Sequence, residues 1–279
     1  MDDSNPKETR KRMRKGIYLL PNLFTTGALF AGFYAIIAAM NQNFEIAAIA
    51  IFLAGLLDGL DGRVARMTNT QSAFGAEYDS LSDMVSFGVA PALVVYLWSL
   101  VYLKDVSNLM GKLGWLAAFV YATATALRLA RFNTQIGVAD KRYFQGLASP
   151  AAAAVVMGAV WVCESYQIAG QDVTYGALIL TTAAGVLMVS KFSYYSFKDF
   201  DMRERVPFVT MLAIVLIFVF LSLETSTFLF LFFFLYMLSG PVVSLFRWNR
   251  KRTRLAEGIE EPGAEAKPAE ENEKNTDEK

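Results

Sequence analysis

Long apolar runs alternate with short polar segments along most of the chain. A helix needs about 20 apolar residues to cross roughly 30 Å of hydrocarbon, and runs of that length recur between residues 19 and 246. The pattern predicts spans at about 19–40, 44–62, 80–103, 113–130, 149–169, 173–190, 206–223 and 228–246. We therefore expect an all-α integral membrane protein.

The distribution of basic residues predicts the orientation of these spans. Basic residues gather in KETRKRMRK near the start and in RWNRKRTR near the end. With a cytoplasmic N-terminus, both termini lie inside, together with the loops near 63–79, 131–148 and 191–205. Every Lys and Arg except Lys104 and Lys112 then falls on the inner side. Cytoplasmic loops carry an excess of Lys and Arg, so this orientation is the expected one.

Composition agrees with a membrane protein and excludes some chemistry. The chain is 54% hydrophobic and 19% charged, with a mean hydropathy of +0.35, which is more apolar than a soluble domain requires. It contains no histidine, which excludes imidazole acid–base catalysis, histidine metal ligands and a phosphohistidine intermediate. The single Cys163 cannot form an internal disulfide. Residues 247–279 are basic and then acidic, with few large apolar side chains, and we expect a disordered cytoplasmic tail.

Four aspartates interrupt the apolar pattern where the second span ends and the third begins. They are Asp58, Asp61, Asp79 and Asp83. Spacings of three and four residues put each pair on one face of a helix, and the predicted topology puts both pairs near the inner interface. We therefore expect the four carboxylates to converge.

Converging carboxylates repel one another unless protons or cations neutralise them. An all-oxygen site suits a hard divalent ion such as Mg²⁺ or Mn²⁺, which usually keeps phosphate oxygens among its ligands. Gly59, Gly62 and Gly75 leave room for a ligand to approach the backbone, and Arg63 and Arg66 supply cations suited to phosphate. Each of these residues alone has an ordinary structural role, but the set at this spacing favours a site for a phosphate ester.

The same stretch resembles the signature of the CDP-alcohol phosphotransferases, D-x2-D-G-x2-A-R-x8-G-x3-D-x3-D. The matching positions are Asp58, Asp61, Gly62, Ala65, Arg66, Gly75, Asp79 and Asp83. The resemblance implies a six-helix catalytic membrane core that binds a CDP-linked donor on the cytoplasmic side through two divalent ions, usually as a homodimer. On this basis the expected segments are a basic N-terminal segment (1–16), the catalytic core (17–205), two further transmembrane helices (206–246) and the tail (247–279).

The resemblance also implies roles for individual residues. Asp58, Asp61, Asp79 and Asp83 would be metal ligands, and Asp83 would also be the general base. The donor CDP-diacylglycerol would be bound by Asn22, Thr25, Gly62, Ala65, Arg66 and Gly75.

Three further stretches resemble bacterial phosphatidylserine synthases within this family. They are ALRLARFN (126–133), FQGLASPAAAA (144–154) and YYSFKDFDMRERVPF (194–208). The expected reaction is attack of the L-serine hydroxyl on CDP-diacylglycerol, which gives phosphatidylserine and CMP in the bacterial inner membrane, with no nucleic-acid partner. Because serine carries a carboxylate, its pocket needs a cation, and Arg128 and Arg131 with Asn133 are the candidates.

Three alternatives remain open at this point. The acceptor could be glycerol phosphate or inositol phosphate, since Lys141, Arg142 and Lys191 are also available. An aspartate-rich membrane prenyltransferase would need a second aspartate motif, and the spacing of Asp199 and Asp201 does not provide one. A cation transporter would carry carboxylates near mid-membrane on several helices, whereas these cluster at one interface.

Overall fold

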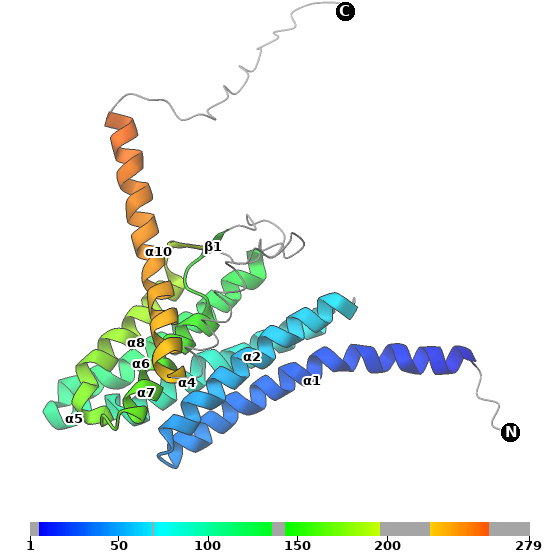
Figure 1. Cartoon of the computed structure of the whole chain (residues 1–279), viewed down its shortest axis with the longest axis horizontal. Helices are drawn as coiled ribbons and strands as arrows, with labels where there is room; N and C mark the ends of the chain where they lie inside the picture. Colours follow the sequence, from blue (N-terminus) through cyan, green and yellow to red (C-terminus); the bar gives the residue numbers. More distant parts are fainter. Residues whose placement is uncertain (1–5, 69, 136–142, 196–223, 257–279) are drawn as a thin grey trace, which may run out of the picture.

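The computed structural model describes residues 6–68, 70–135, 143–195 and 224–256, and these residues are almost entirely helical (Figure 1). Among them, five helical stretches are long and apolar enough to cross a membrane. They are Pro21–Met40, Ala73–Trp98, Asn108–Thr134, Gly170–Val189 and Thr225–Leu245. The chain is therefore a multi-pass membrane protein. The expected span at 206–223 lies outside the described residues.

The first two helices form a tightly packed pair. α1 (Pro6–Met40) and α2 (Phe44–Thr68) lie side by side (Figure 1), joined by a short turn in which Gln42 has a φ of 62°. Alanines such as Ala35 and Ala54 are fully buried in this part of the core, and such small side chains let membrane helices approach closely. α2 is not among the five apolar stretches because charged residues occur toward both of its ends.

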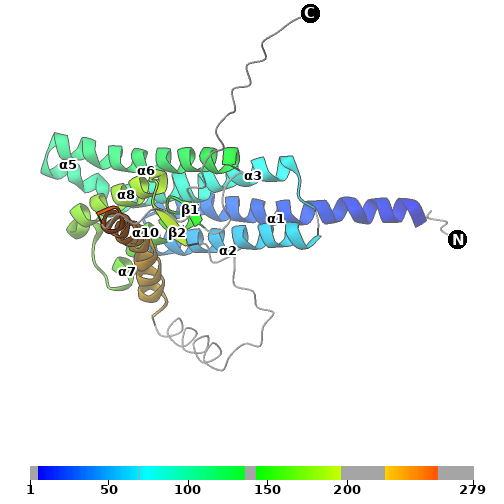
Figure 2. The ribbon, with the colours of Figure 1, turned by 90° about the horizontal axis from the view of Figure 1, so that it is seen from above.

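The third span is built from three consecutive segments. α3 (Ala73–Asp83) continues into a π-helical turn (Met84–Val89) and then into α4 (Ala90–Trp98). A 3₁₀ turn (Leu100–Tyr102) and the short α5 (Leu103–Val106) lead into the long α6 (Asn108–Gln135). Both α2 and α3 pack against α1, and Figure 2 shows them on either side of it.

Four further helical elements follow α6 among the described residues. They are α7 (Ser149–Ser165), a 3₁₀ turn (Gly170–Val173), α8 (Thr174–Val189) and α10 (Thr225–Ala256). α10 packs against α7 and β2, and the buried hydroxyl of Tyr194 donates a 3.0 Å hydrogen bond to the carbonyl of Met237.

A small antiparallel sheet joins the loops that follow α6 and α8. It pairs β1 (Tyr143–Gln145) with β2 (Ser193–Tyr195). Gly146 follows β1 with a φ of +81°, and a Cβ there would lie 2.2 Å from the carbonyl oxygen of Met188. Only glycine fits this left-handed position against a backbone.

The element boundaries differ from the sequence-based ones near the aspartates. α2 continues to Thr68 instead of ending at 62, and the next helix begins at Ala73 instead of 80. The connection is thus much shorter than the expected loop at 63–79, because polar residues extend both helices beyond their apolar parts. The two short strands were not predicted, since three paired residues leave no detectable alternation.

Candidate functional site

Three of the four aspartates meet between α2 and α3. Asp58, Asp61 and Asp79 each present one carboxylate oxygen, and these oxygens lie within 4.8 Å of one another. Asp61 is only 5% exposed. The expected convergence of the two pairs is thus observed for these three residues.

Asp83 belongs to the same cluster. The carboxylate of Asp58 lies within hydrogen-bonding reach of both Asp79 and Asp83. Carboxylates at this separation must share protons or be neutralised by cations. One oxygen of Asp79, Oδ1, is buried and has no hydrogen-bond partner, as expected for an oxygen that faces a cation. The all-carboxylate donor set therefore fits hard divalent ions such as Mg²⁺ or Mn²⁺.

Contacts to α1 fix the positions of both aspartate-bearing helices. The hydroxyl of Thr25 donates a 2.7 Å hydrogen bond to Oδ2 of Asp61. On the other side, Ser82 donates to the carbonyl of Thr25 at 3.2 Å, and Tyr78 shares a 2.9 Å hydrogen bond with Thr26. α1 therefore holds one carboxylate directly and anchors the helix that carries two others.

α3 begins with a side-chain cap. Ser72 has extended backbone geometry, and its Oγ accepts a 3.0 Å hydrogen bond from the amide of Gly75. Such a cap satisfies one of the amides that a helix N-terminus leaves unpaired. The cap fixes the start of α3, the helix that carries Asp79 and Asp83 toward α2.

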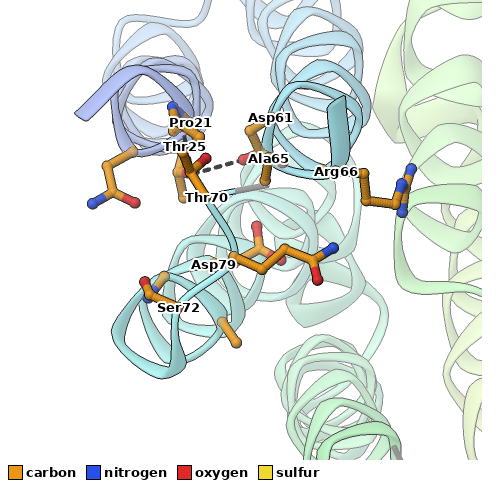
Figure 3. A pocket seen from close by; sticks show the side chains of 13 residues that line it. Pro21, Thr25, Asp61, Ala65, Arg66, Thr70, Ser72 and Asp79 are labelled. Atoms are coloured by element: carbon orange, nitrogen blue, oxygen red, sulfur yellow. Dashed lines mark hydrogen bonds between the residues drawn. The ribbon is translucent and has the colours of Figure 1, made fainter. Parts of the chain in front are cut away.

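A cavity of about 270 Å³ opens beside the aspartate cluster (Figure 3). Asp61 and Asp79 face it from α2 and α3. The predicted donor-binding residues Asn22, Thr25, Gly62, Ala65, Arg66 and Gly75 all line it, together with Pro21, Thr70, Gln71, Ser72 and Ala76. Asp58 and Asp83 belong to the cluster but are not among the lining residues.

Two glycines of the cavity are explained by their surroundings. A Cβ on Gly62 would meet nothing within 4 Å, so this position opens onto free space. A Cβ on Gly75 would lie 3.1 Å from Ser72 Oγ and 3.6 Å from Asn22 Oδ1. A side chain at 75 would therefore crowd the capping hydroxyl of Ser72 and contact Asn22.

The three predicted acceptor residues have different surroundings, and none lines the cavity. Arg128 interacts electrostatically with Asp83 and donates a 2.8 Å hydrogen bond to Ser149 Oγ, while its Nε is buried with no hydrogen-bond partner. Arg131 donates to the carbonyl of Val189, the last residue of α8, at 3.2 Å. Asn133 donates to Ser80 on α3 at 3.0 Å. Of these three candidates, Arg128 is the one that the fold brings near an aspartate.

Sequence reasoning missed several residues at or beside the site. Pro21 and Ala76 carry no chemical signal of their own. Thr70, Gln71 and Ser72 were not missed in this way, because the hydroxyl and amide groups of the stretch MTNTQSA already favoured a phosphate ligand, and these three residues line the cavity. Ser149, the partner of Arg128, lies at the start of α7 and follows from no local pattern.

Several proteins with similar sequences carry closely related enzyme names. The CDP-diacylglycerol–serine O-phosphatidyltransferase of Helicobacter pylori is 39% identical over 182 residues, which cover 65% of this chain and 74% of the relative. The enzyme of the same name from Methanocaldococcus jannaschii is 40% identical over 159 residues, 57% of this chain and 66% of the relative. The archaetidylserine synthase of Methanothermobacter thermautotrophicus is 34% identical over 177 residues, 63% of this chain and 69% of the relative.

The family match covers the whole site. Residues 18–196 match the CDP-alcohol phosphatidyltransferase family. This range runs from α1 to β2 and includes all four aspartates, the residues that line the cavity and Arg128. The aspartate cluster, the adjoining cavity and this match lead to one conclusion: the chain belongs to the CDP-alcohol phosphatidyltransferase family.

Proposed function

We propose that the protein transfers the phosphatidyl group of CDP-diacylglycerol to L-serine, with release of CMP. The serine hydroxyl oxygen forms a bond to the lipid-side phosphorus, the bond from that phosphorus to the CMP oxygen breaks, and the hydroxyl proton passes to a base. The observation that carries the proposal is the cluster of four aspartates beside a cavity with Arg66 in its wall. The names of the relatives support serine as the acceptor.

The cavity residues have the chemistry that a nucleotide diphosphate requires. The guanidinium of Arg66 suits phosphate oxygens. Gly62 leaves the backbone of α2 open to the ligand, and Asn22 offers amide groups from α1. With the donor held here, its acyl chains can remain in the bilayer beside the apolar helices.

The aspartates are the proposed holders of two divalent ions, Mg²⁺ or Mn²⁺. Asp58, Asp61 and Asp79 are the ligands that the geometry favours, with Asp83 as a further one. When bound, such ions neutralise the diphosphate and stabilise the charge that develops on the leaving group. Thr25 keeps the Asp61 carboxylate oriented by its hydrogen bond.

Asp83 is the proposed general base. It lies at the edge of the cluster next to Asp58 and within electrostatic range of Arg128. The unpartnered Nε of Arg128 is suited to the serine carboxylate. An acceptor bound there would have its hydroxyl near Asp83, which accepts its proton. Asn133, bonded to Ser80, is proposed to border the acceptor, and Arg131 is proposed to anchor the end of α8.

The setting of the reaction is part of the proposal. We assign the catalytic core to residues 17–205 and infer a homodimer in a bacterial inner membrane, with both termini and the site on the cytoplasmic side. The distribution of Lys and Arg supports this orientation. Residues 206–246 are proposed as two additional helices, of which the second corresponds to the apolar part of α10.

The test is a transfer assay with the purified protein in detergent. CDP-diacylglycerol, labelled serine and Mn²⁺ or Mg²⁺ should give labelled phosphatidylserine and CMP, and glycerol phosphate or inositol phosphate in place of serine should give no product. Asp83→Asn should lose most of this activity. Asp105→Asn, an exposed aspartate outside the site, is the matched control and should retain it. Product from a phosphorylated acceptor but not from serine would contradict the proposal.

A further inference from the structure

The third span contains a proline at a position that disrupts its backbone hydrogen bonds. In a regular α-helix the amide of residue 91 would donate to the carbonyl of Phe87, four residues earlier. Residue 91 is Pro91, which has no N–H and whose ring collides with that carbonyl in a regular helix. The backbone here widens into the π-helical turn Met84–Val89, in which the amide of Ala90 donates to the carbonyl of Val85.

The carbonyl that Pro91 cannot satisfy has a donor from another helix. The hydroxyl of Tyr121 on α6 donates a 3.0 Å hydrogen bond to the carbonyl of Phe87. Both side chains are buried, with Tyr121 0% exposed. No water is present in the hydrocarbon region to solvate a free carbonyl, so neighbouring helices must supply such donors.

Close packing holds Tyr121 and the turn against each other. A Cβ on Gly88, within the turn, would lie 3.1 Å from Thr125 Cγ2 on α6. A Cβ on Gly185 of α8 would lie 3.1 Å from the Cα of Tyr121. α6 is therefore packed closely against both the turn and α8, and the fully buried phenol of Tyr121 lies within this contact.

The turn starts directly after Asp83. A π-helical turn accommodates one more residue than an α-helical one, which rotates the preceding segment by about 100° relative to the following one. α4 is fixed in the core through buried residues such as Ala90 and Val94. The turn thus determines the direction in which Asp79 and Asp83 point from α3.

We infer that Tyr121 is a positioning residue for Asp83 and acts by stabilising the π-helical turn through the carbonyl of Phe87. It touches neither the aspartates nor the cavity in the contacts of the described residues. The role of Asp83 as general base rests on the proposed function. The effect of Tyr121 on the direction of the Asp83 carboxylate rests on the structure alone.

The primary test measures Mn²⁺ binding to the purified protein in detergent by electron paramagnetic resonance, which needs no substrate. Tyr121→Phe removes only the hydroxyl. Its Kd for Mn²⁺ should rise several-fold, and kcat for phosphatidylserine formation should fall about tenfold with little change in the KM for CDP-diacylglycerol. Tyr175→Phe, an exposed tyrosine on α8, should behave as wild type. An unchanged Kd for Mn²⁺ in Tyr121→Phe would overturn the inference.

A second variant separates positioning from a general loss of packing. Pro91→Ala restores an amide that can bond to Phe87, so the turn should relax toward a regular α-helix and Mn²⁺ binding should weaken. In this background Tyr121→Phe should cause little further loss. Equal effects of Tyr121→Phe in both backgrounds would contradict the inference.

The inference about Tyr121 can still be tested if a variant fails to fold or if the wild-type protein is inactive. If Tyr121→Phe does not fold, Mn²⁺ binding by Pro91→Ala alone decides, and wild-type affinity in that variant overturns the inference. If wild-type protein forms no phosphatidylserine, the proposed function fails while the Mn²⁺ measurements still test the role of Tyr121.

Discussion

The hydroxyl of Thr25 on α1 donates a 2.7 Å hydrogen bond to the carboxylate of Asp61 on α2. Both residues are buried, and both line the cavity beside the aspartate cluster. A carboxylate that accepts a hydrogen bond on one oxygen presents the other in a fixed direction, which is how second-layer partners orient metal ligands. α1 thus contributes to the geometry of a cluster whose acidic residues all lie on α2 and α3.

Thr25→Val should therefore weaken metal binding while leaving the fold intact. Valine has nearly the same shape but cannot donate to Asp61. Loss of such a partner typically lowers metal affinity by about 10-fold to 100-fold. We expect the Mn²⁺ concentration for half-maximal activity to rise by about tenfold. Thr182→Val on α8 serves as the control, because within the described part of the chain the Thr182 hydroxyl donates to the carbonyl of Leu178 in its own helix. An equal Mn²⁺ dependence of activity in Thr25→Val and Thr182→Val would argue against a role of Thr25 in orienting Asp61.

Removal of divalent ions should stop the reaction reversibly. Treatment with EDTA should abolish CMP release, and added Mg²⁺ or Mn²⁺ should restore it. Asp79→Asn removes a proposed ligand and should lower activity at least about 100-fold, since loss of a ligand exceeds the effect of losing its outer partner. Asp172→Asn, exposed and outside the cluster, should retain both activity and metal response. Full activity of Asp79→Asn at low Mn²⁺ would rule out its role as a ligand.

Gly62→Ala and Gly59→Ala form a matched pair on α2. A Cβ at either position meets nothing within 4 Å, so both variants should fold, and alanine should raise helix stability by up to about 1 kcal/mol. Only Gly62 lines the cavity. Gly62→Ala should raise the KM for CDP-diacylglycerol about tenfold by placing a methyl group where the donor binds. Gly59→Ala should leave the KM unchanged. Steady-state kinetics and thermal unfolding check the two expectations, and equal KM values would disprove this position of the donor.

Arg128 and Arg131 should differ in their effect on serine. Arg128→Gln removes the cation with an unpartnered Nε near Asp83 and should raise the KM for serine by about 10-fold or more, since bonds to charged groups contribute about 1.5–3 kcal/mol. Arg131→Gln breaks a bond to the backbone of α8 and should lower thermal stability more than serine affinity. Kinetics at saturating CDP-diacylglycerol would show the difference. A larger serine KM for Arg131→Gln than for Arg128→Gln would reverse the assignment.

The aspartate motif could be predicted from the sequence because its geometry is local. Asp58 and Asp61 share a helix face by their spacing alone, as do Asp79 and Asp83. The alternation of apolar runs and the distribution of Lys and Arg also indicated that both pairs lie near one interface. The helix boundaries were less accurate, since hydropathy follows the apolar part of a helix and not its polar extensions at Arg63 and Arg66.

The sequence by itself determined the helical membrane class, the family and the identities of the clustered carboxylates, because these depend on composition and on spacing within single helices. Only the tertiary structure decided that Thr25 binds Asp61, that Arg128 lies near Asp83 and that Tyr121 satisfies the carbonyl of Phe87. These contacts join residues far apart in the chain. Their existence depends on how the helices pack and rotate against one another, and no local pattern of side chains specifies that arrangement.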